Sequence, residues 1–390
     1  SKFAEELEKN QKVQGDKVEK VEEIERDVEK LKDKPSARSV VSEALGKQVN
    51  IGGHLKFFLA DKTDGERNDV DQDTNLSAGV NDLYLYFSKS LTDWLSIDIA
   101  PQVEVFASAT PTLGGDIERE SSASVDIDLD EAYMTIRAPY PYDVEFRAGA
   151  IYPMFSEEYA RQSWWHEQYH GNNGLLTLQH WQSWGLEIYK NCCAASFSLP
   201  VYFYPYINAE DRTRDSDSRY TDNNAMKNML LHVSPEFFRW GARFKLLGSF
   251  GWGKWDKDDD NDSWQYAAGL DVKYKGFNFL GEYLRREREN LPLLSGATED
   301  GEDDGYYLKL LYTLNPEWKF LLKYSDVDLW FPSQESLLTD NYKTTSFAVN
   351  YWITEGSTIM PQIDYVDADR SDGSETLEYF RYTLGWRTTF

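Results

Sequence analysis

The feature that most constrains the fold is an alternation of apolar and polar residues with a period of two, which recurs from residue 49 to residue 390. In the last segment, the even positions carry the apolar side chains Phe380, Tyr382, Leu384, Trp386 and Phe390, and the odd positions are mostly polar, basic or small. A period of two places successive side chains on opposite faces of a β-strand. About sixteen such segments can be identified. The sequence therefore predicts an all-β fold in which each strand has one apolar and one polar face.

The connections between the predicted strands differ in length in a regular way. Short connections, such as residues 90–93, 315–317 and 354–357, alternate with long polar ones. The long connections are expected at residues 61–77, 107–122, 154–182, 210–226, 256–263, 287–304 and 331–341. This alternation places all long loops at one end of an antiparallel sheet, as in bacterial outer-membrane barrels. The predicted fold class is a transmembrane antiparallel β-barrel of about sixteen strands, with both chain ends on the periplasmic side.

The composition narrows the class of protein further. The formal net charge of -26 argues against nucleic acid as a partner, and no apolar run reaches the roughly 18 residues that a spanning helix requires. Aromatic residues make up 15% of the chain and gather at strand ends, as expected for the interfacial girdles of a barrel. A soluble β-sandwich or soluble barrel also alternates, but it does not need aromatic residues at so many strand ends. A barrel with a wet interior also explains the mean hydropathy of -0.62.

The first residues have a different pattern from the rest of the chain. Residues 1–34 are rich in Glu and Lys and follow a heptad repeat, whose second half is apolar at Val21, Ile24, Val28 and Leu31. This pattern predicts a helical segment, either a short oligomeric coiled coil or a single solvated helix. We expect residues 35–48 to be a linker and residues 49–390 to form the barrel. Because no basic and apolar leader begins at Ser1, the sequence is expected to be either mature or cytosolic.

A resemblance to a known family is clearest over residues 128–158, DLDEAYMTIRAPYPYDVEFRAGAIYPMFSEE. The matching residues are Glu131, Ala132, Tyr133, Arg147, Gly149, Pro153, Phe155 and Ser156. This stretch resembles two neighbouring strands of the phosphate-selective-porin-like family of bacterial outer-membrane porins, some of which also carry an N-terminal coiled coil. The terminal Phe390 resembles the C-terminal signal that the barrel-insertion machinery reads. Because the long loops are acidic, phosphate selectivity is not carried over.

The longest connection is the best candidate for a site. In sixteen-stranded porins a long loop folds into the barrel and narrows it, and the resemblance implies this role for residues 154–182. The charged residues of this predicted constriction loop are Glu157, Glu158, Arg161, His166, Glu167 and His170. Opposed charges at a narrow neck set ion selectivity. An ordinary surface loop is the alternative. No metal site is expected, because His166 and His170 lack a third ligand in a known pattern.

The polar positions of the strands form the predicted pore wall. Its basic residues are Arg147, Arg243, Lys245, Lys273, Arg286, Lys309, Lys323 and Arg381. Acidic residues alternate onto the same face, so the wall is expected to carry both signs of charge.

The leading functional hypothesis is an outer-membrane porin of a Gram-negative bacterium, a passive channel for small hydrophilic solutes or ions. It is expected to be trimeric, to contact the lipid bilayer and to bind no nucleic acid, with no cofactor, metal or enzymatic activity. The alternative is a barrel sheath that encloses or docks a multihaem cytochrome in an electron conduit. Because the chain has no CxxCH motif, any haem would belong to such a partner. Cys192 and Cys193 are read as two small residues in a turn, or as a disulfide or contact with a periplasmic partner.

Overall fold

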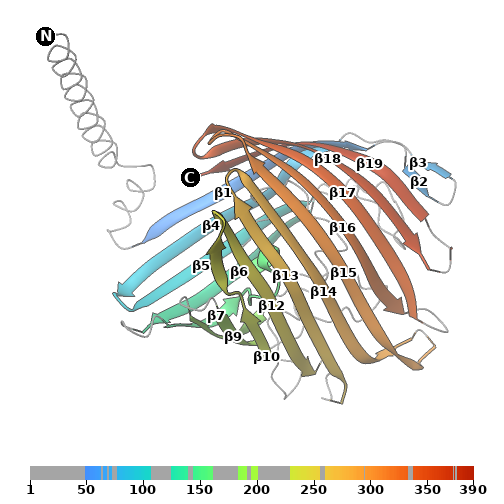
Figure 1. Cartoon of the computed structure of the whole chain (residues 1–390), viewed down its shortest axis with the longest axis horizontal. Coiled ribbons are helices and arrows are strands. Elements are labelled where there is room, and N and C mark those ends of the chain that lie inside the picture. Colours follow the sequence, from blue (N-terminus) through green and yellow to red (C-terminus); the bar gives the residue numbers. More distant parts are fainter. Residues whose placement is uncertain are drawn as a thin grey trace, which may run out of the picture. The chain divides into compact units, whose positions relative to one another are not determined.

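The computed structural model describes residues 49–62, 65–67, 70–72, 77–106, 124–138, 144–160, 183–190, 195–200, 229–254, 260–293, 295–332, 337–371, 373 and 376–390. The chain divides into two compact units, Ser1–Ile51 and Gly52–Phe390. The predicted helix at residues 1–34 and the linker at residues 35–48 lie outside the described residues. The second unit contains the sheet, apart from the first two residues of its first strand (Figure 1).

The described elements are almost all β-strands. They are β1 (Asn50–Lys62), β2 (Gly65–Arg67), β3 (Val70–Gln72), β4 (Ser77–Thr92), β5 (Leu95–Phe106), β6 (Ser124–Arg137), β7 (Val144–Ile151), β8 (Ser183–Lys190), β9 (Ala195–Pro200), β10 (Met229–Val233), β11 (Glu236–Arg239), β12 (Ala242–Lys254), β13 (Asp262–Tyr274), β14 (Phe277–Pro292), β15 (Thr298–Thr313), β16 (Trp318–Pro332), β17 (Leu337–Thr354), β18 (Ser357–Arg370) and β19 (Thr376–Thr389). A single helical turn, α3 (Glu157–Ala160), follows β7. Among the described residues, no helix has the length and hydropathy needed to cross a membrane.

All strands belong to one antiparallel sheet, in which sequence neighbours pair with each other. The order runs from β1 to β4 and on to β9, then through β10 to β12 and on to β19, which pairs with β1. β10 and β11 are two parts of one strand that is interrupted at Ser234 and Pro235, since both pair with β12. β2 and β3 form a small hairpin beside the end of β19. In the described part of the chain the sheet therefore contains sixteen strands, as predicted, and its order of pairing returns to the first strand.

The C-terminal strand shows why these sequences form this sheet. Along β19, exposed and buried residues alternate at nearly every position, as the sequence pattern predicts. β19 pairs with β18 on one side and with β1 on the other. The terminal Phe390 continues the second ladder, because its backbone exchanges two hydrogen bonds of 3.0 Å with Gly53. The last strand is thereby fixed to the first strand of the sheet.

The connections follow the predicted alternation of short and long, but several of the predicted long loops contain strand residues. Residues 61–77 include β2 and β3, and of residues 331–341 only 333–336 lie outside β16 and β17. The tight turns include Asp93–Trp94, Lys275–Gly276 and Glu355–Gly356, each at the same end of the sheet. At the opposite end, residues 287–304 were predicted to be a loop, but β14 continues to Pro292 and β15 begins at Thr298. The loop prediction was wrong because both faces of these strand ends are polar: Arg286 and Asp303 lie on one face, and Arg285 and Glu302 on the other. Without an apolar face, the sequence has no alternation to reveal a strand.

The two faces of the sheet are inverted relative to those of a water-soluble domain. One cross-strand row runs through Lys245, Asp271, Leu280, Lys309, Lys323, Ser346, Asp364 and Arg381. We call the face that carries this row the inner face. The adjacent row on the outer face is Phe244, Val272, Phe279, Leu310, Leu322, Phe347, Ile363 and Tyr382. Lys309 and Lys323 are each 1% exposed, whereas Leu310 and Leu322 are 40% and 50% exposed.

Aromatic residues border the apolar part of the outer face at both ends. Toward the tight turns, Tyr312 contacts Phe277 and Phe320 with ring centroids 4.5 and 6.4 Å apart, respectively. Toward the long loops, Tyr306 lies 6.0 Å from Tyr324. Tyr306 and Tyr312 are six positions apart on β15, or about 20 Å at about 3.4 Å per residue. On β14–β16 the outer face thus carries apolar residues between two groups of aromatic rings.

Candidate functional site

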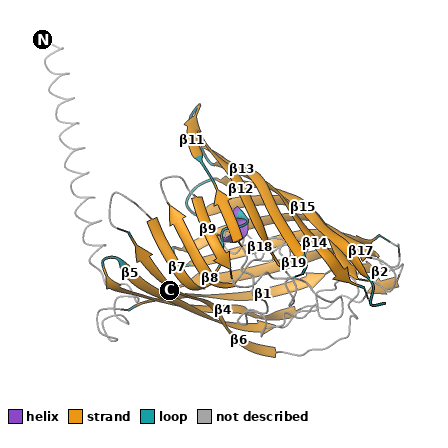
Figure 2. Cartoon of the chain, turned by 90° about the horizontal axis from the view of Figure 1, so that it is seen from below, coloured by secondary structure: helices purple, strands orange, loops and turns teal. Residues whose placement is uncertain are grey.

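The candidate site is the segment that follows β7, which lies against the inner face of distant strands. Residues 153–158 follow the end of β7 and include the first two residues of α3, and we call them the docked segment. In Figure 2, α3 is the purple turn among the orange strands. The segment contacts β12, β14, β15 and β16, which lie far from β7 in the order of the sheet. It is the first part of the predicted constriction loop.

Glu158 joins the docked segment to two neighbouring strands. Its two carboxylate oxygens accept separate hydrogen bonds, one from Lys309 Nζ at 3.1 Å and one from Lys323 Nζ at 2.7 Å. Glu158 is 0% exposed. Ion pairs that are removed from water gain strength only when their remaining hydrogen-bonding groups are also satisfied, and here each carboxylate oxygen faces its own ammonium group.

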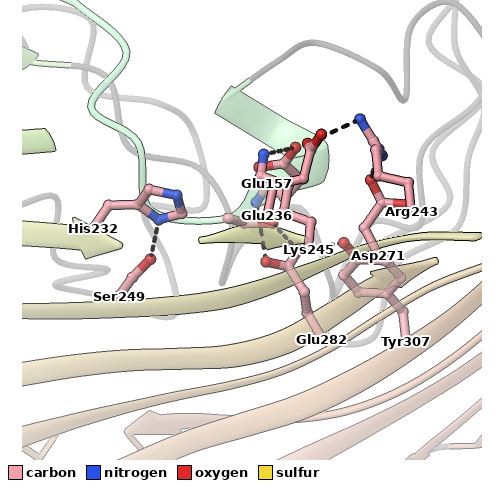
Figure 3. A network of polar contacts seen from close by, with 10 residues as sticks. Glu157, His232, Glu236, Arg243, Lys245, Ser249, Asp271, Glu282 and Tyr307 are labelled. Carbon is pink, nitrogen blue, oxygen red and sulfur yellow. Dashed lines mark hydrogen bonds and ion pairs between the residues drawn. The ribbon is translucent and has the colours of Figure 1, made fainter. Parts of the chain in front are cut away.

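Glu157 joins the segment to the next part of the inner face. Its Oε1 atom lies 2.6 Å from Lys245 Nζ on β12 (Figure 3). Its backbone amide donates a 3.0 Å hydrogen bond to Glu282 Oε1 on β14. Both glutamates of α3 therefore form ion pairs with lysines of the inner face, which the sequence predicted on that face.

Glu282 is the acceptor around which the segment is organised. Besides the Glu157 amide, it accepts a hydrogen bond of 2.8 Å from Ser156 Oγ and another from the Tyr307 hydroxyl on β15. Glu282 and Tyr307 are both buried. Three donors converge on one buried carboxylate, which is the arrangement that stabilises a charge away from water.

Apolar packing fixes the start of the segment. Phe155 is buried in a cluster with Leu230, Leu247, Leu280 and Leu284 on the inner face. Its carbonyl oxygen accepts a 2.5 Å hydrogen bond from Ser249 Oγ, which also contacts His232 Nδ1 at 2.8 Å (Figure 3). The docked segment is thus held by apolar packing, hydrogen bonds and ion pairs together.

The charges at the docked segment balance. The wall supplies three lysines, Lys245, Lys309 and Lys323, and the buried carboxylates beside them are Glu157, Glu158 and Glu282. The segment therefore contributes two carboxylates, Glu157 and Glu158, to a stretch of wall that carries these three lysines together with Glu282 and Asp271.

The other predicted wall residues lie on the same inner face and most of them are paired. Arg147 contacts Glu187 at 3.1 Å, Arg243 contacts Asp271 at 2.5 Å, and Arg381 contacts Asp364 at 2.8 Å. Arg286 pairs with the buried Asp303, which also pairs with Arg288. Lys273 is exposed near a tight turn. The wall is mixed in sign, as expected from the alternation.

Several predicted residues cannot be placed beside this segment. Arg161, His166, Glu167, His170, Cys192 and Cys193 lie outside the described residues. The described residues contain no group of three His, Cys, Asp or Glu side chains suited to a metal ion. Conversely, the sequence analysis did not assign Glu282 and Tyr307 to the site. The alternation in β14 and β15 places both on the inner face, but only the fold brings Ser156 and Glu157 to them.

Comparison with known proteins gives a match by fold only. No protein-family model matches the chain, and no curated protein matches it in sequence. The fold is similar to that of the anion-selective porin from Comamonas acidovorans, with a TM-score of 0.54 and 11% identity over 88% of this chain and 99% of that one. The outer-membrane channel DcaP of Acinetobacter baumannii has a TM-score of 0.54 and 13% identity, over 88% and 97% of the two chains. OprB of Pseudomonas putida has a TM-score of 0.52 and 10% identity, over 90% and 96%. The chain therefore has the fold of outer-membrane porins.

Proposed function

We propose that this chain is a non-enzymatic porin of the outer membrane of a Gram-negative bacterium. It forms a transmembrane barrel around a water-filled channel, through which small hydrophilic solutes or ions diffuse passively. The observation that carries the proposal is the pair of adjacent rows across β12–β19, one charged or polar except at Leu280 and the other made of apolar and aromatic residues. An apolar outer band between aromatic belts suits lipid acyl chains, and a polar interior suits water.

The docked segment supports a channel with a built-in constriction. A barrel of about sixteen strands leaves an open aqueous lumen unless something narrows it. The segment from β7 reaches the inner face of β12–β16, where Glu157 and Glu158 meet Lys245, Lys309 and Lys323. In the proposed channel, residues 154–182 narrow the lumen, and their charges help to set ion selectivity.

Membership of the phosphate-selective-porin-like family remains part of the proposal. The residues that carry this resemblance are coupled in the structure: Tyr133 lies opposite Gly149 across β6 and β7, and the Arg147 guanidinium lies 5.8 Å from the Tyr133 ring centroid. Selectivity for phosphate is not proposed, because the basic residues beside the docked segment face carboxylates.

We also propose that the channel is a homotrimer and that Phe390 acts as the insertion signal. Support for a trimer comes from fold similarity alone: OmpT of Vibrio cholerae, described in a trimer form, has a TM-score of 0.52 and 10% identity over 88% of this chain and 99% of that chain. Support for the signal comes from Phe390 itself, which ends the alternating strand and is 55% exposed.

Reconstitution into planar bilayers tests the function directly. Protein that migrates differently in gels before and after boiling, as a folded barrel does, is expected to produce stepwise increases of conductance. Folded protein that gives no current would contradict the porin proposal and favour the cytochrome sheath. The visible absorbance of haem in the purified protein would then show whether a cytochrome copurifies with it. No feature of the described residues favours the sheath at present.

A further inference from the structure

Two neighbouring hairpins end in turns that each place a basic side chain over an aromatic ring. At the turn between β11 and β12, the Arg239 guanidinium lies 5.0 Å from the centre of the Trp240 ring. At the turn between β13 and β14, the Lys275 ammonium lies 5.1 Å from the centre of the Tyr274 ring. The two turns adjoin, because a Cβ atom on Gly241 would lie 3.9 Å from the ring of Tyr274. We call Arg239, Trp240, Tyr274 and Lys275 the basic rim.

The basic rim is exposed. Trp240 is 80% exposed and Tyr274 is 43% exposed, and Arg239 and Lys275 are exposed as well. Figure 2 shows that the hairpin at β11 projects beyond the adjacent strands. The backbone of Trp240 has φ of 51°, which is uncommon for a large aromatic residue. The turn therefore holds a tryptophan outward in a conformation that its own side chain disfavours.

The basic rim lies just beyond the apolar part of the outer face. Tyr274 is level with Phe277 and Tyr312, in the aromatic row toward the tight turns. By the register of β12 and β13, Ala242 is level with Tyr274, and Trp240 lies two positions farther out, or about 7 Å at about 3.4 Å per residue. The headgroup layer of a bilayer adds about 5–8 Å on each side of the hydrocarbon core. The basic rim is therefore at the level of the headgroups when the apolar residues lie in hydrocarbon.

The basic charges of the rim are not balanced by carboxylates of the same hairpins. Within the part of the chain that the structure describes, neither Arg239 nor Lys275 forms an ion pair. The carboxylates at this end of β11–β14 are Glu236 and Asp271, which lie on the inner face and contact Arg243 at 3.3 and 2.5 Å, respectively. The rim is thus a local patch of positive charge and aromatic surface on a chain with a formal net charge of -26.

The opposite border of the outer face carries the other sign of charge. Asp304 lies directly opposite Asp328, and Asn341 lies between Asp328 and Asp369 in the same cross-strand row. Like charges in such positions repel each other, so a further anion is disfavoured there. An anionic headgroup is consequently favoured at the tight-turn border and disfavoured at the long-loop border.

We propose that the basic rim binds the headgroups of anionic phospholipids in the leaflet on the tight-turn side of the membrane. Arg239 and Lys275 attract the phosphate, as basic residues near a membrane surface attract anionic lipids. Trp240 and Tyr274 occupy the interface between headgroups and acyl chains, which aromatic rings with one polar end prefer. The inference rests on the proposed transmembrane barrel and adds the class of lipid that lies beside β11–β14.

Quenching of Trp240 fluorescence by brominated lipids tests the inference in the full-length chain. The protein is reconstituted into two vesicle preparations with the same contents of phosphatidylglycerol and phosphatidylcholine. Bromine is carried by the acyl chains of phosphatidylglycerol in one preparation and of phosphatidylcholine in the other. The contribution of Trp240 is the difference between the wild-type protein and Trp240→Phe. We expect brominated phosphatidylglycerol to quench this contribution more strongly than brominated phosphatidylcholine does.

Two double variants, each with and without Trp240→Phe, separate the rim from the total charge. The excess quenching by phosphatidylglycerol is expected to be lost in Arg239→Gln/Lys275→Gln. It is expected to persist in Arg285→Gln/Lys343→Gln, which removes the same charge from the acidic border, where Arg285 contacts Glu302 and Lys343 lies opposite Asp326. Gel migration before and after boiling shows that each variant is folded.

Each contrary result overturns the inference in a recognisable way. Equal quenching of Trp240 by the two lipids excludes a preference for anionic headgroups, and loss of the excess in both double variants assigns it to net charge instead of the rim. If the other tryptophans are quenched and Trp240 is not, the rim lies outside the bilayer, while the barrel proposal stands. If neither brominated lipid quenches any tryptophan, the chain does not enter the bilayer, and the barrel proposal and this inference are both wrong.

Discussion

The buried carboxylates of the inner face have different partners, and this difference decides what each one does. Asp364 pairs with Arg381 within the wall, so it stabilises two neighbouring strands. Glu157 and Glu158 come from the docked segment and neutralise wall lysines, while Glu282 holds the backbone and side chains of that segment. Substitutions at these positions can therefore test two things separately: the charge that the docked segment contributes, and the contacts that hold the segment in place.

The double substitution Glu157→Gln/Glu158→Gln tests the charge. It removes the segment's two carboxylates from beside Lys245, Lys309 and Lys323, so we expect the proposed channel to become less selective for cations, or more selective for anions, than the wild-type protein. The field of distant charges is screened within about 10 Å at 0.1 M salt, so charges beside the channel dominate the result. Reversal potentials in a salt gradient measure the change.

The control for this double variant is Glu302→Gln, which removes a carboxylate paired with Arg285 on the outer face. It is expected to leave the reversal potential unchanged. If the double variant also leaves it unchanged, the docked segment does not line the channel.

The substitution Glu282→Gln tests whether Glu282 holds the docked segment in place. The amide group would present donors to Ser156 Oγ or to the Tyr307 hydroxyl, and a buried polar group left unsatisfied costs about 1–3 kcal/mol. We expect the segment to become mobile, with larger fluctuations of the open-channel current at a similar ion selectivity. Asp364→Asn is the matched control, since its carboxylate is equally buried but bonds to Gln362 and Arg381. Equal current noise in the two variants would show that Glu282 does not position the segment.

At the scale of elements, close approach between β6 and β7 requires a glycine. Gly149 has φ of 137°, and a Cβ atom there would overlap the carbonyl oxygen of Ala132 on β6. β7 leads directly into the docked segment, so its register determines where that segment begins. The resemblance to porins had singled out Gly149, but sequence alone gave no physical reason for it.

We predict that Gly149→Ala destabilises the folded barrel, by about 1–3 kcal/mol for the backbone conformation alone, with more from the overlap. The temperature of the change in gel migration measures the effect. Gly248→Ala serves as the control, because its nearest neighbour is Val233 O at 3.8 Å, an ordinary contact distance. Similar stability of the two variants would mean that the β6–β7 approach is not a constraint.

At the scale of the whole molecule, the described sheet is complete without the first residues of the chain. β19 pairs with residues 54–62 of β1, and the described order of strands returns to β1 from β19. The stability of such a sheet comes from ladders that link every strand to two neighbours. The described strand pairing begins at β1, and the contribution of residues 1–31 is a matter for experiment.

Deletion of residues 1–31 is expected to preserve heat-modifiable migration and channel conductance. It is expected to change the oligomeric state or periplasmic contacts if the heptad pattern forms a coiled coil, which size-exclusion chromatography with light scattering would measure. Failure of the deleted protein to assemble in the outer membrane, with normal synthesis, would instead make this segment part of barrel formation.

The sequence by itself determined that the fold is all-β, with about sixteen strands that have one apolar and one polar face over most of their length. It could do so because a period of two is a local property, and because an exposed apolar face is visible in the sequence of each strand separately. The alternation did not reveal the strands where both of their faces are polar, as at the ends of β14 and β15. Only the tertiary structure decided that Ser156, Glu157 and Glu158 meet Glu282, Lys245 and the Lys309–Lys323 pair. These contacts join residues from about 90 to 165 positions apart, and no periodicity within one strand encodes which distant wall a loop will reach.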